Sequence, residues 1–121
     1  MFKDGHIIEV VVIVQKHIAE QIRIILIKKM VGQDILEKQK IMVSFLKNLR
    51  DEQITNLALI YDIINNEQKG KITDINTLRN KLCHALKLDE LQKYSKNKRD
   101  MIIDNARKIS QILDKIIFQQ S

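Results

Sequence analysis

Apolar residues recur along most of this chain at alternating steps of four and three positions, the period of an α-helix with one buried face. The first such segment predicts a helix over residues 6–30, with a stripe made of Ile7, Val11, Val14, Ile18, Ile22 and Ile25. Its β-branched run at residues 10–14 favours a strand instead, because branching at Cβ restricts the rotamers available in a helix. We favour the helix, because the same apolar phase continues for further turns beyond that run.

Two shorter helices are predicted to follow Gly32. Asp34 is placed to cap the first of them, three residues before Glu37, and this helix is expected to end near Arg50. Asp51 then starts the next helix. The inward positions of the two helices, in chain order, are Ile35, Met42, Phe45 and Leu49, then Ile54, Leu57, Tyr61 and Ile64.

The polar stretch of residues 65–71 is predicted to be a loop. Asp74 is expected to open a fourth helix, and either Asn97 or Asp100 the last. The apolar stripes of these two helices are Ile75, Leu78, Leu82 and Ala85, then Ile102, Ala106, Ile109, Leu113 and Ile116. The chain has no proline and only three glycines to interrupt long helices. The prediction is an all-α, four- to five-helix up-and-down bundle, with residues 1–121 as a single helical domain.

The composition excludes several classes of protein. A chain of 121 residues with 45% hydrophobic residues suits one compact domain. The single cysteine, Cys83, excludes an internal disulfide scaffold and favours a reducing compartment such as the cytoplasm. Charged residues interrupt the most apolar stretch, residues 7–30, so no membrane span is expected. Residues 1–5 lack a cationic segment, a clean apolar core and a small-residue cleavage site, so no signal peptide is expected either. The net charge of +6 permits a polyanionic partner without requiring one.

The residues best suited to chemistry lie in residues 78–85. The apolar members of this segment would hold the helix against the core, which leaves Arg79, Asn80 and His84 on the rest of its circumference. Asn80 and His84 are four apart and share a face. Arg79 and His84 are five apart, and an ideal helix separates such positions by about 140°. One chain therefore makes a poor site, whereas two chains paired through this helix about a twofold axis would line one cleft with two copies of Arg79 and His84.

Such a cleft suits metal-independent RNA cleavage, in which the ribose 2′-OH attacks the adjacent phosphate. The reaction needs a base, an acid and a cation for the developing charge. A histidine can be neutral in one protomer and protonated in the other, so two copies of His84 would supply the base and the acid. Arg79 would bind phosphate oxygens through its forked guanidinium, and Asn80 would orient the imidazole or the ribose. This chemistry predicts an RNA substrate and requires no metal or cofactor.

Residues 79–84, Arg-Asn-Lys-Leu-Cys-His, resemble the Arg-x4-6-His signature of the HEPN superfamily of helical ribonucleases. The order of a long first helix, further helices, the motif and one more helix is also similar to that family. The resemblance implies ribonuclease activity, a homodimer with a shared cleft, and service as the toxin of a toxin–antitoxin or phage-defence system with a cognate antitoxin. It implies catalytic roles for Arg79 and His84 and a supporting role for Asn80. One branch of the family is silenced by modification of a tyrosine two positions after the histidine; Leu86 occupies that position here and excludes this route.

The basic run at residues 93–99 is a second candidate surface. Its cationic side chains would follow RNA phosphates, and its tyrosine would offer a platform on which a base could stack. The candidate RNA-binding residues of this run and of the region around the motif are Lys81, Lys87, Lys93, Tyr94, Lys96, Lys98 and Arg99.

Other functions fit the same pattern. A non-catalytic helical module, either an inactive HEPN fold or a small subunit of an RNA-guided complex, would retain RNA without cutting it. A regulator would dock another protein through the first helix, which has more apolar positions than one face can hold. Arg79 and His84 also suit structural roles, as a solvated arginine and a half-buried histidine. His6 and His17 have no cysteine or carboxylate at ligand spacing, so no metal site is predicted.

Overall fold

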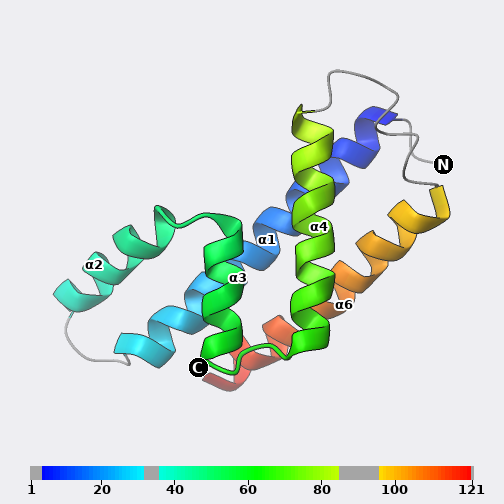
Figure 1. The fold of residues 1–121 in the computed structure, drawn as a ribbon. Helices are drawn as coiled ribbons and strands as arrows, with labels where there is room; N and C mark the ends of the chain where they lie inside the picture. Colours follow the sequence, from blue (N-terminus) through cyan, green and yellow to red (C-terminus); the bar gives the residue numbers. More distant parts are fainter. Residues whose placement is uncertain (1–3, 32–35, 85–95, 121) are drawn as a thin grey trace.

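The computed structural model describes residues 4–31, 36–84 and 96–120, and this part of the chain forms five packed helices with no strand. The helices are α1 (Asp4–Val31), α2 (Leu36–Lys47), α3 (Asp51–Ile60), α4 (Asn66–His84) and α6 (Lys96–Gln120). Successive helices run in alternating directions, so the bundle is up-and-down (Figure 1). None of these helices combines the length and the apolarity that a membrane crossing needs. The predicted all-α fold class is confirmed.

α1 is the central helix of the core, because it packs against each of the other four helices. Val11, Ile18, Ile22 and Ile25 of the predicted stripe are buried, and Val14 is partly buried against the same core. The strand alternative for residues 10–14 is wrong, since all five residues are helical. Most of this β-branched run packs against the core, and burial outweighs its weak helix propensity.

α2 packs chiefly against α1, so only a narrow strip of its surface is covered. Leu46 is fully buried, whereas Phe45, which the pattern placed inward, is 52% exposed. That prediction is wrong because contact with a single helix covers one row of side chains, and this row passes through Met42 and Leu46. The predicted cap Asp34 and the predicted stripe residue Ile35 lie outside the described residues.

α3 ends at Ile60, before the Ile64 that the pattern assigned to its buried face. Asp62 has a φ of 58°, in the left-handed region that a short aspartate tolerates better than most residues, and the helix does not continue through it. Tyr61, predicted to face inward, is therefore 37% exposed, and that prediction is wrong. The chain returns to the core at Ile63 and Ile64, which are both buried.

α4 begins at Asn66, so the predicted loop at residues 65–71 is wrong, and Asp74 lies inside a helix that it was expected to open. The cause is a capping box at Asn65. Its Oδ1 accepts a hydrogen bond from the backbone N–H of Gln68 at 2.8 Å, and Gln68 Oε1 accepts one from the backbone N–H of Asn65 at 2.9 Å. These two hydrogen bonds satisfy backbone N–H groups that have no partner within the helix at its N-terminus. They stabilise a helix in a stretch whose polar composition suggested a loop.

Replacing Asn65 with alanine is expected to lower the free energy of unfolding by about 1 kcal/mol, because the first turn of α4 loses its cap. Urea denaturation followed by far-UV circular dichroism measures the change. Asn66→Ala is the matched control, since Asn66 is exposed in the same turn and lies outside the capping box. Equal losses in the two variants would contradict the capping assignment.

α6 packs on both α1 and α4. It begins at Lys96, one residue before the predicted Asn97, and its predicted stripe is confirmed. Gln21 of α1 is only 2% exposed and fixes the two long helices together. Its Nε2 donates to the carbonyl of Ser110 at 3.0 Å, and its Oε1 accepts from Ser110 Oγ at 2.9 Å.

Candidate functional site

A polar groove of about 800 Å³ lies between α3 and α4. One wall comes from the start of α3 and the residues before it, namely Leu49, Arg50, Asp51, Glu52, Thr55 and Asn56. The other wall comes from α4, through Lys69, Thr73, Asn76, Thr77, Arg79 and Asn80. Among these described residues Leu49 alone is apolar and none is aromatic, so the groove suits a polar ligand.

Arg79, the arginine of the motif, lies in the wall of this groove. Its Nη1 is 3.4 Å from Oδ2 of Asp51, at the start of α3. The Arg79 side chain is 36% exposed, and its Nε is buried without a hydrogen-bond partner among the described residues. Asp51 therefore holds the Arg79 guanidinium in the groove wall, a contact that the motif alone does not predict. A pair this exposed contributes about 1 kcal/mol or less to stability, so its main effect is to orient the guanidinium.

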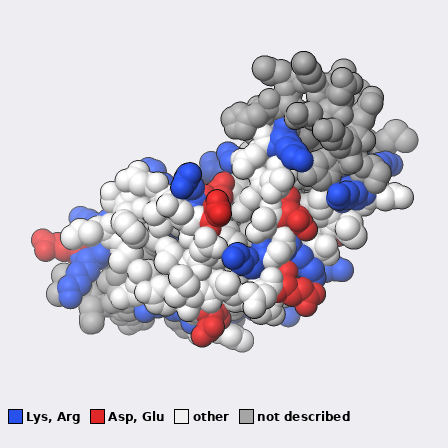
Figure 2. All heavy atoms as spheres, viewed as in Figure 1, with Lys and Arg blue, Asp and Glu red and all other residues white. Residues whose placement is uncertain are grey.

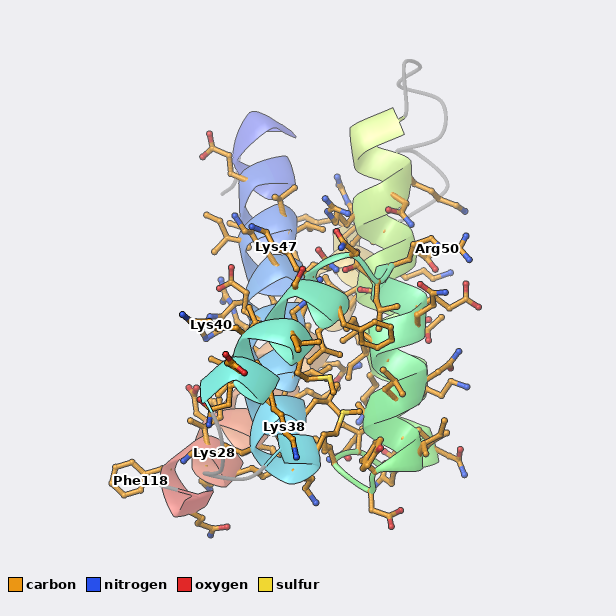
Figure 3. All side chains as sticks on the ribbon, turned by 90° about the vertical axis from the view of Figure 1, so that its left-hand side faces the viewer. Lys28, Lys38, Lys40, Lys47, Arg50 and Phe118 are labelled. Atoms are coloured by element: carbon orange, nitrogen blue, oxygen red, sulfur yellow. The ribbon has the colours of Figure 1, made fainter. Side chains whose placement is uncertain are left out.

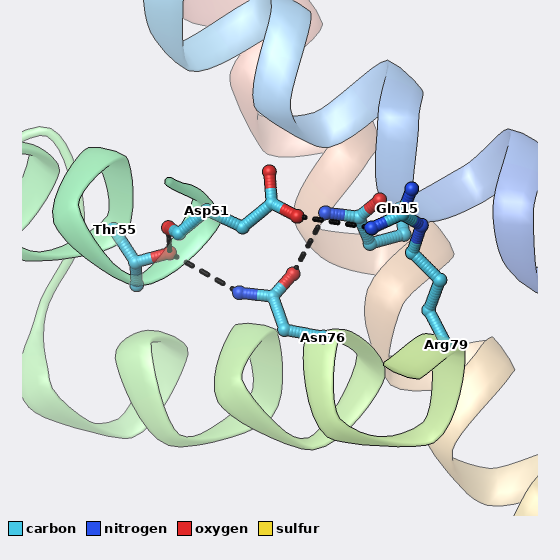
Figure 4. Close-up of polar contacts among 5 residues, drawn as sticks. All are labelled: Gln15, Asp51, Thr55, Asn76 and Arg79. Atoms are coloured by element: carbon cyan, nitrogen blue, oxygen red, sulfur yellow. Dashed lines mark hydrogen bonds and ion pairs between the residues drawn. The ribbon is translucent and has the colours of Figure 1, made fainter. Parts of the chain in front are cut away.

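A row of polar side chains beneath the ion pair links three helices (Figure 4). Gln15 of α1 is 3% exposed and donates from Nε2 to Asn76 Oδ1 of α4 at 3.0 Å. Asn76 Nδ2 donates to Thr55 Oγ1 of α3 at 3.4 Å. Thr55 in turn donates to the backbone carbonyl of Asp51 at 2.8 Å. Buried polar groups need such partners, so these bonds fix α1, α3 and α4 relative to one another at the base of the groove.

This network was not predicted from the sequence, although the sequence contains one signal for it. Gln15 occupies the apolar phase of α1, between Val11 and Ile18, and a polar residue in a buried phase needs a partner. The partner, Asn76, is 61 residues away, and no local pattern connects the two. Asp51 was identified only as a helix start, and nothing in its surroundings along the chain marks it as the partner of Arg79.

The structure brings Asn80 to the same groove as Arg79, where Asn80 is exposed. α4 continues without a break through His84, so all three candidate catalytic residues belong to one helix. The side chain of His84 lies outside the described residues. Two of the three candidate catalytic side chains therefore line one groove.

The described candidates for RNA binding lie at one end of the bundle. Lys81 is exposed near the C-terminal end of α4, and Lys96 and Lys98 are exposed in the first turn of α6. These two helix ends lie at the same end of the molecule (Figure 1). Arg99 is partly buried, and its Nε has no hydrogen-bond partner among the described residues. Residues 96–99 are thus helical rather than part of a connection. Three further candidates lie outside the described residues, namely Lys87, Lys93 and Tyr94.

Charge is mixed on the groove side of the molecule. Lys and Arg side chains alternate with Asp and Glu over α3 and α4 (Figure 2). Within the groove, Arg50, Lys69 and Arg79 accompany two carboxylates, of which Asp51 is paired. Figure 3 shows Lys40 and Lys47 of α2 on the side away from Arg50, and no lysine of α2 is among the described lining residues of the groove.

In the described part of the chain, no three His, Cys, Asp or Glu side chains gather closely enough to hold a metal ion. No family model, curated protein or solved structure matches this chain. The interpretation of the site therefore depends on the motif, the groove and the all-α architecture.

Proposed function

We propose that this protein is a metal-independent endoribonuclease of HEPN type that works as a homodimer. The observation that supports the proposal best is the opening of Arg79 and Asn80 onto one polar groove, on the helix that continues to His84. The helix after the motif packs back on α1 and α4, as the family resemblance implies. By the same resemblance, the protein acts as the toxin of a toxin–antitoxin or phage-defence system and has a cognate antitoxin.

The reaction begins when a ribose 2′-OH attacks the adjacent phosphorus and one copy of His84 accepts the hydroxyl proton. A bond forms between the 2′-oxygen and phosphorus, and the bond from phosphorus to the 5′-oxygen breaks. The second copy of His84 gives a proton to the departing 5′-oxygen. The products are a 2′,3′-cyclic phosphate and a 5′-hydroxyl. Arg79 stabilises the charge that develops on the non-bridging oxygens, and Asp51 orients its guanidinium.

Apolar residues that remain on the surface of α1 support pairing of two chains. Ile13 is 66% exposed and Ile24 is 46% exposed. These positions are separated by only about 20° on an ideal helix, so they lie on one face. Covering them in an interface would remove apolar surface from water, which favours association of a domain this small.

The purified protein is expected to cut RNA in the presence of EDTA, to leave DNA of the same sequence intact, and to produce cyclic phosphate ends. Arg79→Ala is expected to lower the cleavage rate by roughly 10²- to 10³-fold, as loss of one donor to a developing oxyanion does. Arg79→Lys should recover little, because lysine lacks the forked geometry of the guanidinium. The control is Arg107→Ala, which removes an exposed arginine of α6. Full cleavage by Arg79→Ala, or an absolute need for Mg²⁺, would contradict the proposal.

A non-catalytic binding module is the alternative, and two observations favour it. The Arg79 guanidinium is already engaged by Asp51. α2 also presents exposed apolar side chains that could contact a protein, namely Ile41, Val43 and Phe45. This alternative predicts retention of RNA or of a protein without cut ends, and a strictly monomeric state in light scattering would favour it. Growth arrest on expression that disappears with His84→Ala would favour the nuclease.

A further inference from the structure

We propose that the groove between α3 and α4 binds the sugar–phosphate backbone of the RNA strand beside the cleaved linkage, with Arg50 and Lys69 as phosphate-binding residues. The inference rests on the proposed nuclease function and extends it to residues that no sequence motif singled out. It places the strand along α4, leading away from Arg79 and Asn80 toward the start of that helix.

The α4 wall carries a continuous row of polar side chains. Lys69, Thr73, Thr77 and Asn80 follow one another at steps of four, four and three, which keeps them on one face of the helix. The row extends over roughly 16 Å of helix axis. Thr73, Thr77 and Asn80 are exposed, and Lys69 is partly exposed. None of the four makes a side-chain hydrogen bond or ion pair with another described residue, so their donors are available to a ligand.

The chemistry of the lining matches a nucleic-acid backbone. Arg, Lys, Thr and Asn side chains are among the usual protein contacts to phosphate and sugar oxygens. Proteins that stack the bases of a single strand do so mainly on aromatic side chains, and none is found among the described lining residues. Pockets for small organic ligands are mostly apolar, unlike this groove. The backbone would therefore lie in the groove with its bases outward, and the groove itself would read little sequence.

The carboxylates of the groove decide where the phosphates lie. Asp51 is paired with Arg79, so its charge is offset locally. Glu52 is exposed in the first turn of α3 and would repel a phosphate. The phosphates are thus expected along the α4 wall, near Lys69, with Arg50 contacting them from the opposite wall, just before α3. Glu52 limits the affinity of the groove in this arrangement.

The test uses a fluorescein-labelled RNA oligonucleotide with 2′-O-methyl riboses, which cannot attack their phosphates. Fluorescence anisotropy then measures binding without cleavage. Lys69→Gln is expected to weaken binding by roughly tenfold, as loss of a charge-assisted contact does. The slope of log affinity against log salt should fall by about 1. The control is Lys108→Gln, which removes the same charge from an exposed position on α6.

Glu52→Gln gives a second test, in which the expected change is tighter RNA binding. Damage to the fold would weaken binding and cannot produce this result. Removing this carboxylate is expected to strengthen binding by roughly threefold, because an exposed charge contact is worth under about 1 kcal/mol. Equal weakening by Lys69→Gln and Lys108→Gln would show binding to positive charge in general and would overturn the groove assignment. Unchanged affinity in Lys69→Gln would overturn it as well.

The wild type and the Lys69→Gln variant also distinguish a failure of the groove proposal from a failure of the nuclease proposal. Binding that depends on Lys69, together with no cutting of unmodified RNA, would support the groove and contradict the nuclease. Cleavage of unmodified RNA by Lys69→Gln with wild-type kcat/KM would support the nuclease and overturn the groove. A raised KM with an unchanged kcat in Lys69→Gln is the result that agrees with both.

Discussion

His84→Ala is expected to reduce RNA cleavage by roughly 10²- to 10⁴-fold, the range that a positioned acid or base contributes. The effect should be large because, in the proposed mechanism, two symmetry-related copies of His84 act in the same reaction, one as base and one as acid. Cleavage is measured on unmodified RNA with EDTA present. His17→Ala serves as the control, since it removes an exposed imidazole from α1. Both variants should retain the helical circular dichroism of the wild type.

A mixed dimer tests the shared cleft separately. When excess His84→Ala protein is exchanged into the wild type, most wild-type chains enter dimers with one imidazole. Activity is then expected to fall nearly to the level of the variant, because each cleft has lost either its base or its acid. Half of the wild-type activity in the mixed dimer would mean that each chain works alone, and the shared cleft would be wrong.

Ile22→Ala is expected to lower the free energy of unfolding by about 2–5 kcal/mol, the cost of emptying a core position. Ile22 is 1% exposed on α1, the helix that the other four described helices contact, so few neighbours are free to fill the cavity. Against a total stability of roughly 5–15 kcal/mol, this loss is a large fraction. Chemical denaturation with a circular dichroism readout measures it.

Ile60→Ala is the matched control for the core, since it removes the same atoms from a side chain that is 70% exposed. Its expected change lies within about 0.5 kcal/mol. Similar losses at Ile22 and Ile60 would mean that α1 is not the centre of the core.

The long helices were predicted well because many side chains repeat the same period. In α1 and α6 the apolar phase persists over several turns, so a single exception such as Gln15 does not obscure it. The start of α4 was missed, although Asn65 followed by Gln68 is a readable capping-box spacing. The polar composition of residues 65–71 led to the prediction of a loop. In the fold, the capping box starts a helix there in spite of that composition.

The short helices were predicted less well, because their buried faces depend on which neighbours cover them. Phe45 shares the apolar pattern of α2 but lies outside the strip that α1 covers. Tyr61 follows the period of α3 but comes after the helix has ended. Periodicity reports which residues share a face, and only packing decides how much of that face is buried.

By itself, the sequence determined that the protein is helical, which residues of α1 and α6 face inward, and that Arg79, Asn80 and His84 lie close together along one segment. These properties follow from short-range periodicity. Only the tertiary structure decided that Asp51 holds Arg79 across 28 residues of chain and that α3 and α4 enclose a groove. Such contacts join residues far apart in the chain, and their free energy arises when whole helices pack, so no local pattern contains them.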